Sequence, residues 1–163
     1  MMIMGGAKGG YFNTIERFDG DTWTPLSNNL TYGRKLHCSV AICSTEVLVI
    51  GGYFTSSYIS AMEKNDINGN HIETLPSMEL ARSSSGCGVY NNEVYVTGGF
   101  NSTGLSSVEV YNILAKQWRK ANNIKIFGGY DAVAKISMEV FYGINWIEDN
   151  TNLSKPFMEV DQF

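Results

Sequence analysis

The sequence predicts an all-β protein in which one structural unit is repeated along the chain. Three features predict it by recurring at one common interval: short apolar runs that end in glycine, a glutamate motif and a bulky apolar position. The chain has 163 residues, with 17 glycines but only 3 prolines, and 12% of its residues are aromatic. Many glycines with few prolines favour tight turns, and aromatic residues favour half-buried strands. The sequence shows no helical pattern of apolar residues.

Glycine pairs are the first mark of the repeat. A β-branched or aromatic run of strand length precedes each pair. The first glycines stand at positions 5, 51, 98 and 143, at intervals of 46, 47 and 45 residues. Glycine admits a positive φ and a close approach of another backbone, so we expect each pair to end a strand at a crowded position. These glycines are Gly5, Gly6, Gly51, Gly52, Gly98, Gly99 and Gly143, with Ile144 in place of the last second glycine.

Two further marks follow each glycine pair at a similar interval. Glutamates recur with spacings of 47, 46 and 50 residues, and a bulky apolar residue recurs with spacings of 49 and 46. We expect each glutamate to accept bonds from buried backbone donors or to pair with a charge of a neighbouring unit. We expect each tryptophan to lie as an apolar plate between units. The residues are Glu16, Glu63, Glu109, Glu159, Trp23, Ile72 and Trp118.

Each repeat contains four predicted strands, and a four-stranded antiparallel unit of this length is one blade of a β-propeller. The first strands are predicted over 38–43, 86–90 and 130–135. The ordered trio of glycine pair, glutamate and tryptophan resembles the kelch repeat, and this resemblance covers essentially the whole chain. It implies a kelch-type β-propeller, here an incomplete arc of about 3.5 four-stranded antiparallel blades. The expected parts are a partial blade over 1–36, blades over 37–84 and 85–128, and a partial blade over 129–163.

Propellers close with about 4 to 8 blades, so the chain is expected to be a fragment, with the rest of the ring elsewhere. An open arc would expose strand edges that invite pairing or aggregation.

The resemblance implies that partners bind at loops on one face of the propeller. One loop set follows the glycine pairs and the other joins consecutive blades. In kelch adaptor proteins an Arg-Ser pair placed like Arg82-Ser83 resembles the site that grips acidic peptides, and a guanidinium can hold a carboxylate bidentately. Alternatively, Arg82 covers the blade junction, and the loop aromatics pack on one another. The candidate partner-binding residues are Arg34, Lys35, Tyr53, Phe54, Thr55, Ser57, Arg82, Ser83, Phe100 and Asn101; Tyr58 is a further aromatic candidate.

Composition argues against two classes of partner. The net charge is -4 and no cluster of lysine and arginine is present, so nucleic acid is not the expected partner. No apolar run approaches the length of a membrane span. We expect the three cysteines, Cys38, Cys43 and Cys87, to be reduced and packed as small apolar residues, and the protein to be cytoplasmic.

The predicted function is a protein-interaction module and not an enzyme, with no metal or cofactor. The resemblance implies a role as substrate receptor of a cullin-type ubiquitin ligase. The alternatives are an actin or cytoskeletal scaffold, and a kelch-like copper oxidase or extracellular ligand-binding propeller. A copper site is disfavoured because the two histidines, His37 and His71, are 34 residues apart, which places them on different strand positions.

Overall fold

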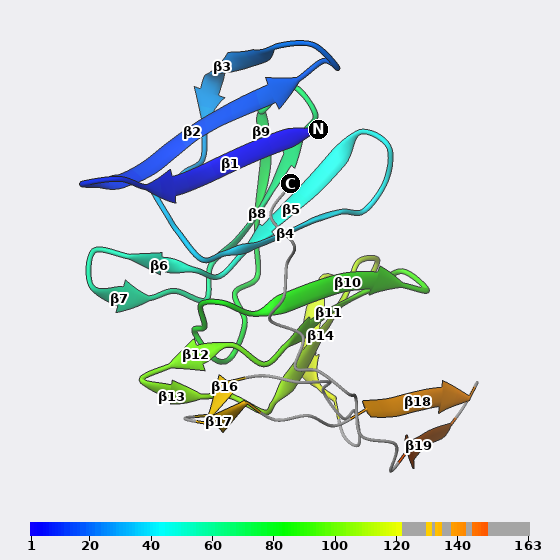
Figure 1. The fold of residues 1–163 in the computed structure, drawn as a ribbon. Coiled ribbons are helices and arrows are strands. Elements are labelled where there is room, and N and C mark those ends of the chain that lie inside the picture. The colour runs from blue at the N-terminus through cyan, green and yellow to red at the C-terminus, as the bar shows by residue number, and fades with distance from the viewer. Residues whose placement is uncertain (122–129, 132, 135–137, 143–144, 150–163) are drawn as a thin grey trace. The chain divides into compact units, whose positions relative to one another are not determined.

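The computed structural model describes residues 1–121, 130–131, 133–134, 138–142 and 145–149. These residues form strands and turns but no helix, and so none that crosses a membrane. The chain divides into two compact units, Met1–Lys120 and Ala121–Phe163, each described by itself below. The first unit holds three larger antiparallel sheets that follow one another along the chain (Figure 1). The predicted all-β repeat architecture, an incomplete arc of propeller blades, is confirmed.

The first sheet has three strands in the order β1-β2-β3. Its pairing places Ile3 opposite Glu16, and the register shifts between Met4 and Gly6, where the glycine pair begins. Ile15 is fully buried on β2. The strands are β1 (Met2–Ala7), β2 (Tyr11–Phe18) and β3 (Trp23–Asn29).

The second and third sheets have four strands each and share one register. Val49 lies opposite Glu63 in the second sheet, and Val96 lies opposite Glu109 in the third. The glutamate therefore faces the same strand position in each sheet, as the repeat predicts. The second sheet runs β4 (Cys38–Ala41), β5 (Glu46–Ile50), β8 (Met62–Asp66) and β9 (His71–Leu75). The third runs β10 (Gly86–Tyr90), β11 (Glu93–Thr97), β14 (Val108–Asn112) and β15 (Gln117–Lys120).

The segments after the pairs Gly51–Gly52 and Gly98–Gly99, which the sequence suggests are polar loops, form short hairpins. Their turns are made by non-glycine residues with positive φ, +44° at Thr55, +62° at Ser56 and +61° at Ser102. These tight turns let two residues on each side pair across the hairpin. The strands are β6 (Tyr53–Phe54), β7 (Ser57–Tyr58), β12 (Phe100–Asn101) and β13 (Thr103–Gly104).

The second unit contains two short hairpins, one of which corrects a prediction. A single strand is predicted over 130–135, but Tyr130 pairs with Ala134, so the backbone folds back on itself there. The strand predicted before position 143 is present as β18. Gly143 and Glu159 lie outside the described residues, as does the loop over 122–127. The strands are β16 (Tyr130–Asp131), β17 (Val133–Ala134), β18 (Met138–Tyr142) and β19 (Asn145–Asp149).

The core of the first unit lies between neighbouring sheets. One buried cluster joins the first and second sheets and contains Met4, Ile15, Leu30 and Val49. Burying each such side chain contributes roughly 1.5–3 kcal/mol. No sheet buries its apolar face alone, so each needs its neighbour. The second cluster joins the second and third sheets and contains Leu48, Ile50, Met62, Leu75, Met78, Val94, Val96 and Tyr111.

The glycine pairs stand where two backbones approach closely, as predicted. Gly51 has φ +63°, and a Cβ placed on it would lie 2.7 Å from the carbonyl oxygen of Arg82. Gly5 repeats this relationship with the carbonyl oxygen of Arg34 at 2.6 Å. The second glycine of each pair, Gly6 or Gly52, donates its N–H to the same carbonyl oxygen over 2.8 Å. Gly5–Gly6 and Gly51–Gly52 therefore each anchor the segment that connects their own sheet to the next sheet along the chain.

The bulky apolar position behaves differently in each sheet. The Trp118 indole N–H donates to the Pro76 carbonyl oxygen over 2.7 Å, so this ring lies at the junction with the preceding sheet, as predicted. Trp23 is 39% exposed and packs on Phe18 of its own sheet, so its place between two units stays a prediction. Ile72 is 45% exposed, and without an indole N–H it cannot donate the hydrogen bond that Trp118 makes to the preceding sheet.

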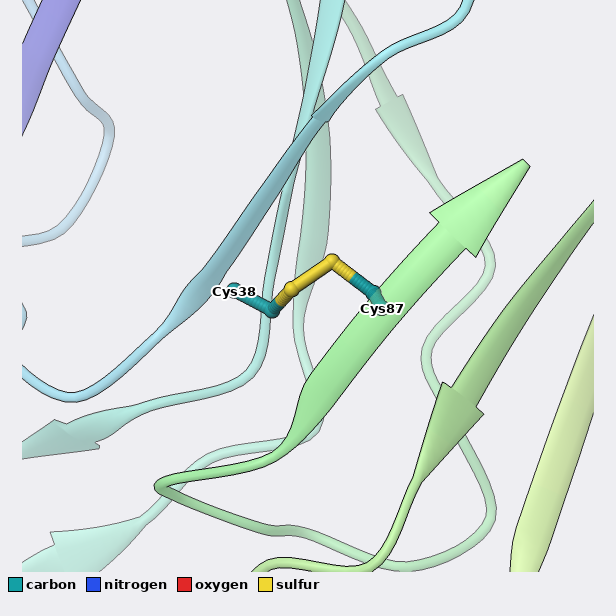
Figure 2. Close-up of a disulfide and its surroundings, with 2 residues drawn as sticks. All are labelled: Cys38 and Cys87. Atoms are coloured by element: carbon teal, nitrogen blue, oxygen red, sulfur yellow. A yellow bond between two sulfur atoms is a disulfide. The ribbon is translucent and has the colours of Figure 1, made fainter. Parts of the chain in front are cut away.

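A disulfide joins the first strands of the second and third sheets. It links Cys38 on β4 to Cys87 on β10, with 6.1 Å between the two Cα atoms (Figure 2). The expectation that all three cysteines are reduced was wrong, because the two strands lie side by side and bring residues 49 apart within bonding distance. Only Cys43 is a free cysteine among the described residues, and it is exposed.

Candidate partner-binding surface

Four of the ten predicted partner-binding residues meet through backbone hydrogen bonds. Lys35, in the segment that enters the second sheet, exchanges bonds of 3.1 and 2.8 Å with Tyr53. Ser83, in the segment that enters the third sheet, exchanges bonds of 3.0 and 2.8 Å with Phe100. The two predicted loop sets are thus joined into one surface, and each entering segment forms a short strand-like edge beside a hairpin.

Aromatic rings from both loop sets form a continuous row. Neighbouring ring centroids are 5.1 to 6.3 Å apart, the range of favourable aromatic pairs. The rings at the two ends are the most exposed, at 45% for Tyr32 and 42% for Phe100. The aromatics therefore pack on one another and still present apolar surface to solvent. This aromatic row consists of Tyr32, Phe54, Tyr11, Tyr53, Tyr58 and Phe100.

Lys35 supplies the positive charge of this surface. Its Nζ lies 5.8 Å from the ring centroid of Tyr11 and 5.5 Å from that of Tyr53, which is cation–π geometry. A pocket of about 320 Å³ opens beside it, between the two entering segments and the two hairpins. Its lining contains the ammonium group of Lys35, two serines and several apolar side chains. The pocket is lined by Lys35, Leu36, Tyr53, Tyr58, Ser83, Ser84 and Phe100.

A second cleft, of about 450 Å³, lies between the first and second sheets. It is lined mostly by apolar side chains, among them Met1, Met4 and Val40, and its polar side chains are Arg17 and Ser39. None of the predicted partner-binding residues lines it. This cleft belongs to the junction between sheets, so the smaller pocket is the better candidate site.

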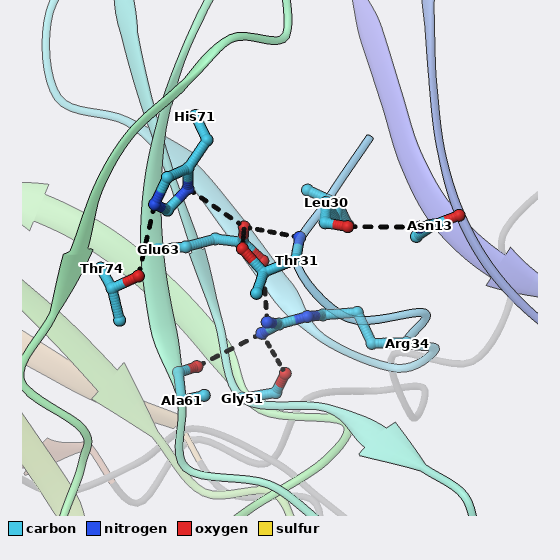
Figure 3. A network of polar contacts seen from close by, with 9 residues as sticks. All are labelled: Asn13, Leu30, Thr31, Arg34, Gly51, Ala61, Glu63, His71 and Thr74. Carbon is cyan, nitrogen blue, oxygen red and sulfur yellow. Dashed lines mark hydrogen bonds and ion pairs between the residues drawn. The ribbon is translucent and has the colours of Figure 1, made fainter. Parts of the chain in front are cut away.

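Arg34 does not face solvent, which corrects its assignment as an exposed partner contact. Its side chain is fully buried, and its Nη2 donates to Glu63 Oε1 over 2.8 Å (Figure 3). Its Nη1 donates to the carbonyl oxygens of Gly51 at 3.0 Å and Ala61 at 3.3 Å. Burial lowers the pKa of the Arg34 guanidinium, and the Glu63 carboxylate opposes that shift. Glu63 also accepts bonds from the backbone N–H and hydroxyl of Thr31.

Arg82 repeats this arrangement one sheet further along. It is fully buried, its Nη2 donates to Glu109 Oε1 over 2.7 Å, and its Nη1 donates to the carbonyl oxygens of Gly98 and Ser107. Of the two alternatives for Arg82, the structure supports the one in which it covers the blade junction. A partner would reach this guanidinium only by opening the ion pair. The expected role of the repeated glutamate is confirmed at Glu63 and Glu109.

The remaining predicted contacts lie on the hairpins. Thr55 and Ser57 are exposed at the turn between β6 and β7, and Asn101 is half-buried on β12. Their positions fit the predicted loop face, and their contact with a partner stays a prediction.

Sequence reasoning missed four residues of this surface. Tyr11 and Tyr32 belong to the aromatic row, and Leu36 and Ser84 line the pocket. Tyr11 lies within the first post-glycine loop, at 7–12, so extending the search for aromatics to every such loop would have found it. Leu36 and Ser84 both have positive φ, +56° and +53°. No sequence signal marks that conformation in a leucine.

The two histidines lie in different surroundings. Burial and the charge of Arg34 lower the pKa of His37 to about 4, with Glu63 opposing. His71, on β9, places its Nδ1 3.5 Å from Glu63 Oε2 (Figure 3). Across the described part of the chain, no group of three or more His, Cys, Asp or Glu side chains is placed to hold a metal ion.

Comparison with known proteins points to one kind of repeat. The model of the Kelch motif matches residues 81–125, which contain Arg82, the pair Gly98–Gly99, Glu109 and Trp118. The match therefore covers the third sheet and the segment that enters it.

Curated proteins of Arabidopsis thaliana are similar to about half of the chain. The F-box/kelch-repeat protein At4g14905 is 32% identical over 74 residues, which cover 45% of this chain and 20% of the relative. The F-box/kelch-repeat protein At4g19870 is 32% identical over 94 residues, 56% of this chain and 23% of the relative. The Kelch repeat-containing protein At1g19470 is 30% identical over 83 residues, which cover 50% of this chain and 20% of the relative. The matched parts span about a fifth of the length of these relatives.

Proposed function

The chain is a kelch-repeat protein, and we propose that it binds a partner protein through the aromatic row and the pocket beside Lys35. The observation that carries the proposal is the continuity of this surface. Rings from three successive repeats meet in one row that ends in exposed Tyr32 and Phe100. Aromatic side chains are enriched in the buried centres of protein interfaces, where a few of them carry most of the binding free energy.

The partner segment that this surface fits is extended and acidic. The Lys35 ammonium stands among aromatic rings at the edge of the pocket, so a carboxylate arriving there would be partly shielded from water. Ser84 is exposed and adds a hydroxyl group to the lining, whereas Ser83 is buried beside the Phe100 carbonyl oxygen. Apolar residues flanking the acid would pack on Tyr58 and Phe100. With Arg34 and Arg82 buried, Lys35 is the predicted basic residue that this surface leaves to bind the acid.

We further propose that the whole protein acts as a substrate receptor of a ubiquitin ligase, with the kelch repeats holding the substrate in the cytoplasm. The support is similarity to proteins named F-box/kelch-repeat proteins, of which the matched parts span about a fifth. We assign the described residues a role in binding a partner and not a role in catalysis. His37 is half-buried beside a backbone junction, whereas His71 contacts Glu63 on another strand position.

The test uses a library of extended 15-residue peptides in which Asp and Glu are compared with Asn and Gln at matched positions. We expect the full chain to select acidic peptides with apolar flanks. Phe100→Ala should weaken the best peptide about tenfold or more, and Lys35→Met should remove the preference for acid. Tyr90→Ala, an exposed aromatic at the far end of β10, is the matched control and should leave the affinity unchanged.

Two results would overturn the proposal. One is selection of basic or uncharged peptides by the wild-type chain. The other is binding that Phe100→Ala and Lys35→Met leave intact. A co-sedimentation assay with filamentous actin tests the alternative that the protein is a cytoskeletal scaffold. A scaffold would sediment with the filaments, and the acidic peptide would not affect that binding.

A further inference from the structure

The Cys38–Cys87 disulfide joins the same two chain segments that line one side of the candidate pocket. Lys35 and Leu36 precede Cys38 by three and two residues, and Ser83 and Ser84 precede Cys87 by four and three. Both pairs line the pocket. The two entering segments also touch one another, since the Ser84 N–H donates to the Leu36 carbonyl oxygen over 2.8 Å. Disulfide, hydrogen bond and pocket walls therefore form one connected unit.

This unit holds its backbone in an unfavourable conformation. Leu36 has φ +56° and Ser84 has φ +53°, in the left-handed region that leucine and serine rarely adopt. Such conformations persist only where the surrounding structure enforces them, and they concentrate at binding sites and switches. Leu36 is also 53% exposed, so burial of its side chain does not account for its position.

The disulfide is the covalent constraint at this place. β4 and β10 belong to different sheets and share no strand pairing, although they lie side by side (Figure 2). The bond ties the beginning of one strand to the beginning of the other, close to the hydrogen bond between Ser84 and Leu36. Both cysteines are only half-buried, so the disulfide does not lie in the fully buried core.

We propose that Cys38–Cys87 is a redox-controlled clamp that sets the shape of the pocket and so the affinity for the partner. The proposal rests on the proposed function. In the reducing direction, a dithiol transfers two electrons and two protons: the S–S bond breaks, two cysteine thiols form, and the reductant becomes a disulfide. Leu36 and Ser84 then relax, the pocket loses its shape, and affinity falls. Cytosolic disulfides are usually transient and redox-sensing, which fits the proposed cytoplasmic location.

The experiment compares the oxidised and dithiothreitol-treated full chain in a Cys43→Ser background, so that reduction acts on the disulfide alone. The probe is the best acidic 15-residue peptide from the library. Amide hydrogen exchange at Ser84 and Phe100 reports on the clamp without any ligand. We expect reduction to weaken peptide binding about fivefold or more and to speed exchange at both amides, and reoxidation to restore both. The variant Cys38→Ser with Cys87→Ser should match the reduced protein in either buffer.

The outcomes separate the clamp from the proposed function. If no peptide binds the oxidised chain, the proposed function fails, and faster exchange on reduction still supports the clamp. If a peptide binds both redox states equally and exchange is unchanged, the clamp is refuted and the binding surface stands. Loss of the β-sheet circular dichroism on reduction would also refute the clamp, because the bond would then be a general structural staple.

Discussion

Arg82 and Glu109 form a buried ion pair in which Nη2 donates to Oε1 over 2.7 Å, and this pair joins two neighbouring sheets. The backbone of Arg82 belongs to the preceding junction, where its carbonyl oxygen accepts the N–H of Gly52 and its own N–H donates to Ile59. Its side chain belongs to the third sheet. One residue therefore connects both sheets, and Arg34 does the same one repeat earlier.

Glu109→Gln should lower the free energy of unfolding by about 3–5 kcal/mol. It leaves the guanidinium of Arg82 buried without a counter-charge, and it weakens the acceptor for the backbone N–H groups of Glu79 and Leu80. Urea denaturation followed by circular dichroism measures the change. The matched control is Glu79→Gln, whose ion pair with Lys120 is exposed, screened by solvent and expected to contribute little. Equal effects of the two variants would contradict the assignment.

Gly51→Ala should destabilise the protein by at least about 1–2 kcal/mol. The residue has φ +63°, and its new Cβ would lie 2.7 Å from the carbonyl oxygen of Arg82, so the junction has to move. Gly88→Ala is the control, because nothing lies within 4 Å of a Cβ at that position on β10. Thermal unfolding of both variants gives the comparison, and a Gly51 variant as stable as the Gly88 variant would argue against a crowded junction.

Trp118→Phe should cost about 1 kcal/mol because it removes the hydrogen bond to the carbonyl oxygen of Pro76 while keeping an aromatic ring against Tyr111. Trp23→Phe alters an indole that is 39% exposed and should cost less than about 0.5 kcal/mol. Denaturant midpoints measured side by side test this difference. A larger loss at Trp23 would mean that the outer strand of the first sheet is covered in solution.

The stability of the protein should fall as the pH drops from about 6.5 to about 4, by an amount on the order of 2 kcal/mol. Burial holds the pKa of His37 at about 4 in the folded state, whereas an unfolded histidine takes up its proton near pH 6.5. The unfolded state therefore binds more protons in this window. The charged groups that act on His37 are Arg34, which lowers its pKa further, and Glu63, which opposes that shift.

His37→Gln provides the comparison for this pH dependence. The acidic groups of the chain are common to both proteins, so the difference between their stability curves isolates the histidine. We expect the two curves to diverge between pH 6.5 and 4, with the wild type losing more. Parallel curves over that range would show that His37 titrates normally.

Much of the fold can be read from periodic residues because each has a local physical requirement. The glycine pairs need positive φ, and the runs before them have strand length and strand composition, so β5 and β11 lie where expected. Glu63 and Glu109 recur because the second and third sheets place a carboxylate at the same register position, opposite Val49 and Val96, where each binds a buried arginine. The short hairpins β6–β7 and β12–β13 also follow the glycine pairs, but their turns use Thr55, Ser56 and Ser102 in place of glycine, so the sequence does not mark them as hairpins.

The amino-acid sequence by itself was enough to predict a repeating four-stranded sheet and to place its loops. Turns and strands depend mainly on residues that are neighbours in the sequence. The surroundings of Arg34, Arg82 and Lys35 required the folded molecule. All three are basic residues in similar segments, yet two are buried against glutamates 29 and 27 residues away, and the third lies over the rings of Tyr11 and Tyr53. Likewise, Cys38 and Cys87 become partners only when two sheets stack. Such contacts depend on which side chains the packing of separate sheets brings within a few ångströms, and no spacing along one strand encodes that.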